Sequence, residues 1–591
     1  MSHAFGWIQD PGSIDNLFKC VELFDKNTST YSDLIHTLIP KKIANTEIKK
    51  QLLQELKSLN RNGQPALAYR SLIGTAFKPR RSAKCNGIIQ ALIPGQRRNF
   101  LADWPADNFL RWAHAMGFIE WDEKSDTFFA TQKGLSVSQK QGNRNAQVDI
   151  LKQAILEYPP AIRILELLND KFTSSPNDPC LTKFELGEEL GFRGEGGFTT
   201  YPQHVVIHAI VTNQLSKNKI LSNWEGSSDK YARMICGWLS DCDIKWVQQV
   251  GKIVTVSIGG TNFQNSIPQS YQITQSGIAA FRRARQRSSK GAVKKRLFFE
   301  MLSTRASDRE HLRTRRALIL QILSKRKINL NAIQVYLVSK NFDIANIPLS
   351  VIEDDINNFT RIGLEVKKNQ NQRFWIRDKL IALKIPRFAI PQLTPSAITK
   401  IKITLANKLI NLNHNFLDLI DLSFDANQNR LFEIRIIDLL RQIPNLNALH
   451  LGGGNRPDGV AYYPDINPQK GLILDAKSYS SGFSVPISER DKMKRYIDEF
   501  NSKSAPNPTK WWLVFQKPTY PPNPINFTFI SSRFIGNFSN QIKYIKDTTN
   551  NDGSVITSEK LLEKVEDVLD KSNPYNTEDF FRDLSSNGEV Q

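Results

Sequence analysis

The sequence is short of cysteine, which argues against two kinds of stabilising site. Its five cysteines lie at positions 20, 85, 180, 236 and 242, and none falls in the C-terminal half. Cysteines this few and this scattered do not predict a disulfide framework. His204 and His208 precede the last two cysteines, but the chain has neither a C-x-x-C pair nor an H-E-x-x-H motif. Exposed histidines and small buried thiols are therefore favoured over a zinc site.

Long apolar stretches are also missing. No apolar run approaches the length of a membrane-spanning helix. The first residues, MSHAFGWIQDPG, have no charged start followed by an apolar stretch, so no secretory signal is expected. We therefore expect a protein of a reducing cytoplasm that has no membrane as its partner.

The sequence does contain a large excess of positive charge. Lys and Arg number 79 against 58 Asp and Glu, which gives a formal net charge of +21 over 591 residues. Such an excess indicates a polyanionic partner, and nucleic acid is favoured over an acidic membrane surface. The hydrophobic content of 40% is ordinary for globular proteins, and the length predicts three or four domains.

A helix followed by a two-stranded hairpin recurs three times. The hairpins are expected at residues 117–135, 252–278 and 363–380, each after a helical segment. The first two end in Thr-Gln-x-Gly, where Thr131 and Thr274 are placed to cap a following helix. Any one hairpin could be an ordinary β-turn unit. Three in series on a basic chain favour tandem winged-helix modules that bind DNA.

Composition marks the later boundaries of the chain. The basic run 281–296 is either a solvated linker or a segment that contacts phosphates. A proline-punctuated segment, 385–395, marks the last boundary. Beyond it, a helical pattern over residues 396–444 gives way to strands and helices that alternate as far as residue 570. This pattern is typical of an α/β domain.

The α/β region contains an apolar strand that ends in charged residues. The segment 471–477 runs from Gly-Leu-Ile-Leu directly into Asp475 and Lys477. Side chains alternate along a strand, so these two residues project to one face while Ala476 points into the core. A strand that served only a core would not end in two opposite charges.

A second carboxylate precedes this strand. A hairpin through residues 463–468 could bring Asp458 beside Asp475, and two carboxylates at one point form an oxygen-rich site for Mg²⁺. Such a metal binds a scissile phosphate and lowers the pKa of an attacking water. Lys477 could hold that water or offset charge that builds on the phosphate. Glu433, on an earlier predicted helix, is either a further metal-site acid or a surface charge, and we weigh the two evenly.

This is the P-D…(D/E)-x-K pattern of restriction-endonuclease-like nucleases, which is weak alone because D-x-K occurs often by chance. Longer blocks are similar to the FokI-like type IIS restriction endonucleases along nearly the whole chain. The matching blocks are Phe5–Trp7, Phe109–His114, Pro159–Ile164, Asn223–Met234, His450–Gly453, Pro457–Gly459, Asp475–Tyr479 and Arg533–Asn537.

The resemblance implies winged-helix recognition subdomains joined by a linker to a separable PD-(D/E)xK cleavage domain of α/β type. It also implies that Asp458, Asp475 and Lys477 form the catalytic set, with Mg²⁺ as the cofactor. We expect recognition subdomains at 1–148, 149–288 and 289–382, a linker at 383–398 and the cleavage domain at 399–591.

Matching positions also imply residues that bind DNA. These are Gln9, Arg80, Gln96, Trp104, Asn223, Glu225, Lys230 and Arg233. Arg and Lys can read guanine, Gln adenine and Glu cytosine, although the basic residues could equally contact phosphates. Two positions depart from the family, Asp10 and Ser222, where Asn is expected. Either departure could alter the choice of target.

The family pattern further implies a transient homodimer on DNA through Asp491 and Arg495, although an acid four residues before an arginine is more often an intrahelical pair. We therefore expect a type IIS enzyme of a prokaryotic cytoplasm that binds a short asymmetric duplex site, similar to GGATG, and cuts both strands outside it. A cognate DNA methyltransferase is the expected partner in the host. The alternatives are a strand-specific nicking enzyme and a DNA-binding regulator with an inactive nuclease domain.

Overall fold

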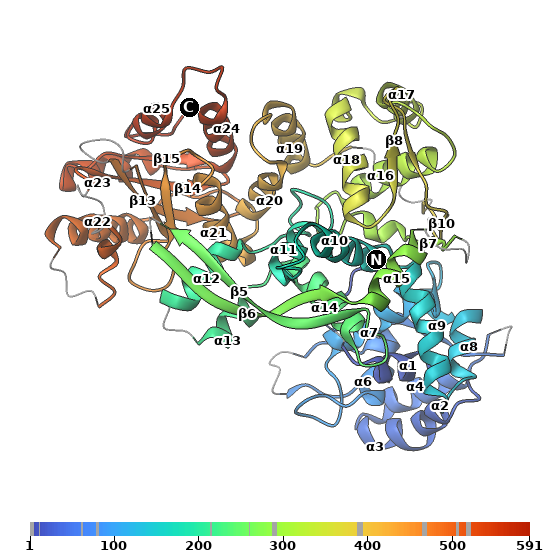
Figure 1. The fold of residues 1–591 in the computed structure, drawn as a ribbon. Helices are drawn as coiled ribbons and strands as arrows, with labels where there is room; N and C mark the ends of the chain where they lie inside the picture. The colour runs from blue at the N-terminus through green and yellow to red at the C-terminus, as the bar shows by residue number, and fades with distance from the viewer. Residues whose placement is uncertain are drawn as a thin grey trace.

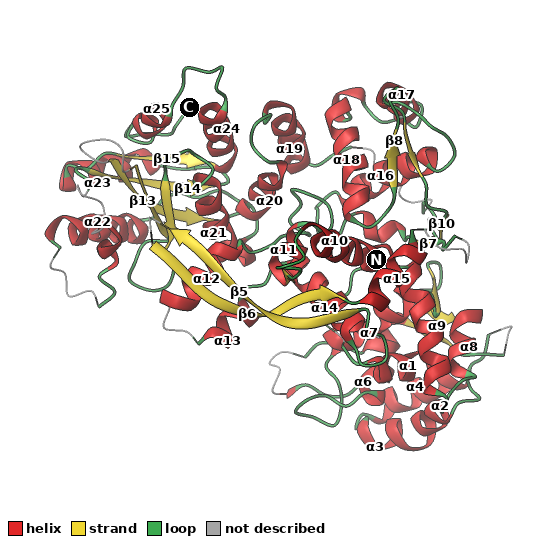
Figure 2. Cartoon of the chain, in the orientation of Figure 1, coloured by secondary structure: helices red, strands yellow, loops and turns green. Residues whose placement is uncertain are grey.

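The structure is a computed structural model in which the helix-rich regions of the N-terminal part lie to one side of a C-terminal domain that is built on a larger β-sheet (Figures 1 and 2). No helix in the described part of the chain is long and apolar enough to cross a membrane. The described residues are 5–10, 12–60, 63–77, 82–212, 216–258, 261–285, 292–386, 394–463, 470–503, 508–515 and 522–591.

The first region is mainly helical and contains a small sheet in the order β1-β3-β2. Its β2–β3 hairpin confirms the first predicted hairpin, and Thr131 caps the next helix by accepting a hydrogen bond from the Gly134 N–H. The elements are α1 (Ile14–Glu22), α2 (Ser29–Asp33), η1 (Leu34–Leu38), α3 (Ile39–Lys42), α4 (Thr46–Lys57), β1 (Ala66–Ala68), α5 (Tyr69–Ile73), α6 (Ile88–Leu92), α7 (Asp103–Ala115), β2 (Ile119–Asp122), β3 (Thr127–Ala130), α8 (Gln132–Ser138) and α9 (Arg144–Glu157).

The second region repeats this plan with a much longer hairpin and a sheet in the order β4-β6-β5. Thr274 caps the following helix through the Gly277 N–H, as predicted. The elements are α10 (Pro159–Ser174), β4 (Leu181–Thr182), α11 (Lys183–Glu188), α12 (Gln203–Thr212), α13 (Lys217–Asn223), α14 (Ser227–Ser240), β5 (Val247–Ile258), β6 (Thr261–Ile273) and α15 (Gln275–Ala284). Of the predicted basic run, residues 286–291 lie outside the described residues.

The third region contains the third predicted hairpin, β8–β9, and a short parallel pair of β7 with β10. One hydrophobic core joins all three regions, and the stacked rings of Trp112 and Trp238, 4.5 Å apart, lie within it. The elements are β7 (Lys295–Arg296), η3 (Phe299–Leu302), α16 (Arg309–Leu323), α17 (Leu330–Val338), η4 (Ile344–Asn346), α18 (Leu349–Arg361), β8 (Val366–Lys368), β9 (Phe374–Ile376) and β10 (Leu380–Ile381).

The C-terminal domain is built on a five-stranded sheet in the order β11-β12-β13-β14-β15, antiparallel through β13 and parallel beyond it. Apolar side chains on each face of the sheet form a separate core, which confirms the predicted α/β character. The elements are α19 (Ala397–Lys408), η6 (His414–Leu417), α20 (Asp418–Ser423), η7 (Ala426–Gln428), α21 (Asn429–Leu440), β11 (Asn447–His450), β12 (Gly459–Tyr463), β13 (Lys470–Lys477), α22 (Ile487–Ser502), η8 (Trp511–Phe515), β14 (Ile525–Ser531), α23 (Phe538–Thr549), β15 (Gly553–Thr557), α24 (Ser558–Leu569) and α25 (Thr577–Asp583).

The long β5–β6 hairpin of the second region reaches the C-terminal domain (Figure 1). Val254 and Ile267 of the hairpin belong to the same hydrophobic core as Phe432 and Leu472 of that domain. The core on this face of the C-terminal sheet is therefore completed by the second region, and the two parts of the chain are docked.

Candidate active site and nucleic-acid interface

Three charged side chains meet at the end of strand β13. Asp458 stands directly before β12, which pairs antiparallel with β13, and its carboxylate accepts a hydrogen bond from the Ala476 N–H at 2.9 Å. The Lys477 ammonium lies 2.5 Å from Asp475 Oδ1 and 3.9 Å from Asp458 Oδ2. Ala476 is buried in the core on the other face, as strand alternation predicts. The connection expected at 463–468 falls, after its first residue, outside the described residues.

Helix α22 brings two further charged residues to this centre, and the sequence analysis did not predict them. Glu489 Oε2 lies 3.2 Å from the Lys477 ammonium, and the Lys492 ammonium lies 3.5 Å from Asp475 Oδ2. Glu489 and Lys492 also pair with each other at 3.3 Å, three residues apart on the helix. In a sequence, such a pair looks like an ordinary intrahelical contact, and only the packing of α22 directs it toward Lys477.

Glu433 lies beside the centre and is largely buried, so it is not a surface charge. Its carboxylate accepts a hydrogen bond from the Asn429 side chain at 2.6 Å and lies 3.2 Å from His450 Nε2. The Asn429 oxygen in turn accepts a hydrogen bond from the Ser478 N–H at 3.3 Å. These contacts connect Glu433 to the end of the strand that carries the catalytic candidates.

Acidic groups are crowded in this centre. Burial raises the pKa of Asp458 well above its usual value, and the neighbouring charges of Asp475 and Glu433 raise it further. Burial also raises the pKa of Glu433 to about 7, with Lys477 opposing the rise and Asp475 adding to it. Burial disfavours the charged form of Lys477, but Asp475 and Asp458 outweigh it and raise the pKa of the ammonium. Clustered carboxylates fit a divalent cation, which would relieve their mutual repulsion.

In the second region, a buried acid orients one of the predicted DNA-binding residues. The Glu225 carboxylate lies 2.9 Å from Arg233 Nε and 2.6 Å from the fully buried Lys183 ammonium. Arg233 and Lys230 both lie on α14. Glu225 therefore holds Arg233 in place, a role that the sequence analysis did not predict. The reading of bases by Arg233 and Glu225 stays a prediction.

Two of the predicted DNA-binding residues of the first region, Gln96 and Trp104, line one cavity. Asp10, Gln96 and Trp104 line this cavity of about 640 Å³, and the Trp104 side chain is 48% exposed. Gln9 precedes Asp10, and its backbone N–H donates to an asparagine of α7 at 3.1 Å. Arg80 lies outside the described residues.

Asp10 lies near predicted DNA-binding residues of both the first and the second region. Burial raises the pKa of this carboxyl, whereas the charges of Arg233 and Lys230 lower it. Asp10, one of the two departures from the family pattern, thus lies within electrostatic reach of both predicted DNA-binding cations.

The residue after Asn223 contacts the C-terminal domain. Asn223 ends α13 and is exposed, whereas Trp224 is buried with its ring edge-to-face against His450 at 5.9 Å. The Arg430 guanidinium lies over the same indole at 5.7 Å. Because His450 also contacts Glu433, two side-chain contacts separate the recognition block from the catalytic centre.

The predicted dimerisation residues lie on α22 and are exposed. Asp491 pairs with the adjacent Arg490 at 2.7 Å, and Arg495 lies 3.6 Å from Glu499. Within the described part of the chain, each residue thus has its own partner, and the intrahelical Asp491–Arg495 pair does not form. Both remain accessible to a second copy, and their role in dimerisation stays a prediction.

Models of four FokI domains match consecutive parts of the chain. Subdomain 1 of the FokI recognition domain matches residues 3–140, and subdomain 2 matches residues 147–288. The FokI D3 domain matches residues 302–371, and the FokI cleavage domain matches residues 395–591. The catalytic candidates fall within the last match.

Whole-chain comparisons agree with these matches. The type II restriction enzyme FokI of Planomicrobium okeanokoites is 35% identical over 95% of this chain and 94% of its own length. The type II restriction enzyme StsI of Streptococcus sanguinis is 28% identical over 95% of this chain and 91% of its own length. A structure of restriction endonuclease FokI bound to DNA superposes with a TM-score of 0.91 at 34% identity, and another structure of FokI with 0.88, each covering 100% of both chains. The chain therefore belongs to the FokI family of type II restriction endonucleases and consists of recognition subdomains followed by a C-terminal cleavage domain.

Proposed function

We propose that this enzyme is of type IIS: its recognition subdomains bind a short asymmetric duplex site, and its cleavage domain hydrolyses both strands outside that site. The observation that carries the proposal is the convergence of Asp458, Asp475 and Lys477 at the end of β13. A regulator with an inactive nuclease domain would have no need to keep these three groups together. The products are 5′-phosphate and 3′-hydroxyl ends.

The residues of the centre have distinct roles in this reaction. Asp458 and Asp475 hold Mg²⁺, which when bound polarises the scissile phosphate and acidifies a water. The Ala476 N–H fixes the orientation of the Asp458 carboxylate. Lys477, held between Asp475 and Glu489, positions the attacking water and offsets the charge that develops on the phosphate.

Recognition depends on residues of the first two subdomains. Arg233 and Lys230 contact base edges in the major groove, with Glu225 fixing the guanidinium, and Gln96, Gln9, Trp104, Asn223 and Arg80 complete the surface. The target is similar to GGATG. The predicted subdomain boundaries at 148/149 and 288/289 and the linker at 383–398 belong to this proposal, although the first boundary falls inside α9.

Double-strand cleavage requires a second catalytic centre, because one centre of this kind cuts one strand. A second copy supplies it through a small polar interface at Asp491 and Arg495 that forms on DNA. The docked cleavage domain must leave the β5–β6 hairpin to reach DNA beyond the recognition site. The enzyme acts in a prokaryotic cytoplasm beside a DNA methyltransferase that protects the host's own sites.

One digestion tests this function. Plasmid DNA is incubated with purified protein and Mg²⁺, and the ends of the products are sequenced. A fixed pair of cuts at a constant offset from one short asymmetric sequence is expected, with no cutting when a chelator removes the metal. Cuts inside the site, cuts on one strand only or cuts at random positions would contradict the proposal.

A further inference from the structure

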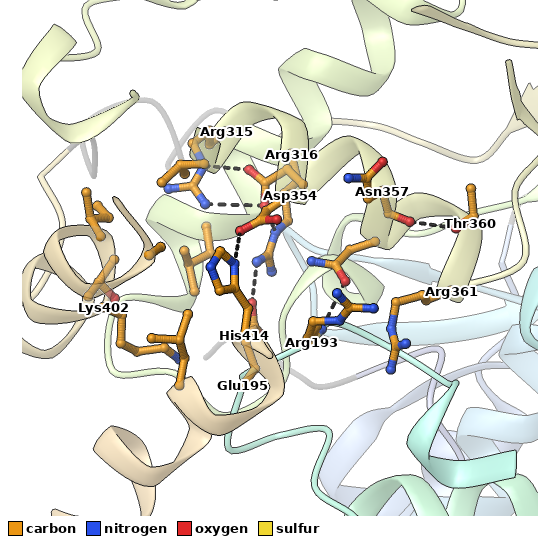
Figure 3. Close-up of a pocket in the computed structure, with 18 of the residues that line it drawn as sticks. Arg193, Glu195, Arg315, Arg316, Asp354, Asn357, Thr360, Arg361, Lys402 and His414 are labelled. Atoms are coloured by element: carbon orange, nitrogen blue, oxygen red, sulfur yellow. Dashed lines mark hydrogen bonds and ion pairs between the residues drawn. The ribbon is translucent and has the colours of Figure 1, made fainter. Parts of the chain in front are cut away.

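A cavity of about 290 Å³ lies where three parts of the chain meet (Figure 3). The second region contributes Arg193, in the loop after α11, and the third contributes Arg315 of α16 and Arg361 of α18. The cleavage domain contributes Lys402 of α19 and His414 of η6. This volume is close to the lower end of the range of small-ligand sites, about 300–1,000 Å³. None of the predicted catalytic or DNA-binding residues that the structure describes lines this cavity.

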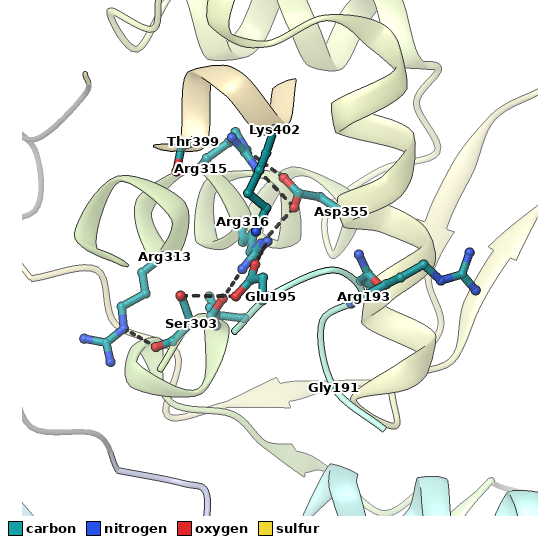
Figure 4. Close-up of polar contacts among 12 residues, drawn as sticks. Gly191, Arg193, Glu195, Ser303, Arg313, Arg315, Arg316, Asp355, Thr399 and Lys402 are labelled. Carbon is teal, nitrogen blue, oxygen red and sulfur yellow. Dashed lines mark hydrogen bonds and ion pairs between the residues drawn. The ribbon is translucent and has the colours of Figure 1, made fainter. Parts of the chain in front are cut away.

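The wall of this cavity carries more positive than negative groups. Its Arg and Lys side chains outnumber its Asp and Glu side chains by six to four. The acids are already engaged: Asp355 pairs with Arg315 at 2.7 Å and with Arg316 at 2.8 Å (Figure 4). Glu189 likewise pairs with Arg361 at 3.1 Å. Two of the cations also pair with acids outside the wall, Lys402 with Asp421 at 2.8 Å and Arg163 with Glu166 at 3.1 Å. Among the described residues, these pairs leave one cation of the wall without an acid, Arg193.

The guanidinium groups of Arg315 and Arg193 have N–H donors without an acceptor among the described residues. The Arg315 side chain is only 4% exposed, yet its Nη1 has no hydrogen-bond partner among the described residues. Arg193 has an exposed side chain that forms no ion pair with the described residues. Burial, together with the charges of Arg193 and Arg163, lowers the pKa of Arg361 to about 10 despite its ion pair. A buried donor without an acceptor is costly, so these groups indicate a missing acceptor.

We propose that this cavity binds a polyvalent oxyanion of the phosphate class. The anion accepts a hydrogen bond from Nη1 of Arg315 and pairs with Arg193, the two groups with donors to spare. Guanidinium groups suit this ligand because their planar donors match the spacing of phosphate oxygens. A neutral ligand would leave the charge of Arg193 without a partner.

The site also acts on the position of the cleavage domain, an extension that rests on the proposed function. Lys402 and His414 belong to the cleavage domain, whereas the arginines belong to the recognition subdomains. An anion between these walls stabilises only the docked arrangement, because separating them removes part of its partners. Occupation of the site therefore slows cleavage by enzyme that is already bound to DNA.

Binding is tested first, by calorimetry on the full chain without DNA or metal. Inorganic pyrophosphate and ATP are titrated separately at constant ionic strength, so that the tighter ligand identifies a free anion or a nucleotide as the source. One equivalent is expected to bind, and Arg193→Gln and Lys402→Gln should each weaken binding about tenfold. Lys230→Gln is the control, because it removes an equal charge from the predicted DNA surface. Absence of saturable binding, or a loss caused by Lys230→Gln instead of Arg193→Gln, would overturn the proposal.

The effect on docking is tested by single-turnover cleavage of pre-bound DNA. Sulfate replaces pyrophosphate, which would sequester the metal, and chloride at equal ionic strength is the reference. At a sulfate concentration about ten times its Kd, wild-type cleavage should slow about tenfold. Arg193→Gln, with a tenfold weaker affinity, should slow only about twofold. Arg373→Gln, outside the cavity, should respond as wild type does. Equal slowing of all three proteins would refute the link to docking. No cleavage even in chloride would instead refute the proposed function and leave the calorimetric result standing.

Discussion

Acidic groups predominate at the catalytic centre, whereas basic groups predominate at the recognition surface. At the centre, the ammonium of Lys477 lies 2.5, 3.2 and 3.9 Å from the carboxylates of Asp475, Glu489 and Asp458. The second ammonium, that of Lys492, pairs with two of the same acids. In the recognition block, the carboxylate of Glu225 binds Arg233 and the buried Lys183, and Asp10 lies within electrostatic reach of Arg233 and Lys230. In the proposed function, the acids of the first arrangement take a further cation, and Arg233 and Lys230 of the second face a polyanion. Opposite proportions of acidic and basic groups would then suit one site to a metal and the other to DNA.

The largest expected effect comes from neutralising an acid of the catalytic centre. Asp475→Asn and Asp458→Asn should each reduce cleavage about 10³-fold or more, because each removes a metal ligand and weakens the hold on Lys477. Specific binding in a gel-shift assay should not change, since recognition lies in other subdomains.

A matched control separates this effect from a general loss of negative charge. Asp547→Asn removes an exposed acid from α23 and should cut as wild type does. If Asp475→Asn still cleaves DNA, Asp475 is not a metal ligand, and the contrast drawn between the two regions is wrong.

The next largest effect is expected from variants that test whether double-strand cleavage needs a second catalytic centre. Asp491→Arg and Arg495→Asp should each suppress double-strand cleavage about tenfold or more, because like charges then face each other across the two-fold axis. Mixing the two variants should restore opposite charges and activity. Linearised plasmid is measured for each variant alone and for the mixture. Normal cutting by both single variants would mean that these exposed residues have no role in pairing.

The sequence predicts those parts of the fold that depend on neighbouring residues. Thr131 and Thr274 cap their helices as expected, because the capping contact spans only three residues. Asp475 and Lys477 share a face, with Ala476 between them in the core, because strand alternation is local. Placing Asp458 beside them required only the antiparallel pairing of two consecutive strands.

Contacts set by packing between distant elements could not be predicted in this way. Glu489 and Lys492 reach the catalytic centre only because α22 packs against the sheet, through Met493 and Tyr496. Lys183 is buried against Glu225, which lies 42 residues further along the chain. From the sequence alone, a lysine at this position would be expected at the surface. The contact of Trp224 with the cleavage domain depends on docking, which no periodicity in the sequence encodes.

A smaller effect distinguishes base reading from phosphate contact at the basic surface. Lys230→Ala and Arg233→Ala should each lower specific affinity by about 1–3 kcal/mol, with discrimination lost at particular base pairs. Competition assays with single-base variants of the site measure this, and Lys325→Ala, an exposed lysine after α16, is the control. A uniform loss on all sequences, with a shallower salt dependence, would show that both residues contact only phosphates.

The smallest expected effect concerns the joint between the two regions, where His414 of the cleavage domain meets Asp354 of the third subdomain. Its Nδ1 lies 2.9 Å from the Asp354 carboxylate, and its Nε2 lies 2.9 Å from the Leu409 carbonyl oxygen. Both ring nitrogens face acceptors, and only the protonated ring can donate to both. The hydrogen bond to Asp354 accordingly raises the pKa of His414 in the docked protein, although burial opposes the rise.

A raised histidine pKa stabilises the docked protein at low pH, and this stabilisation is lost as the pH rises through the raised value. Wild type should therefore unfold at a higher temperature than His414→Gln near pH 6, by a difference worth at most about 1 kcal/mol, because the pair is partly exposed. Near pH 9 the two melting temperatures should converge, since the neutral ring of wild type then keeps one donor only. A difference that does not depend on pH would show that His414 contributes by packing alone. Docking would then not depend on the protonation of His414.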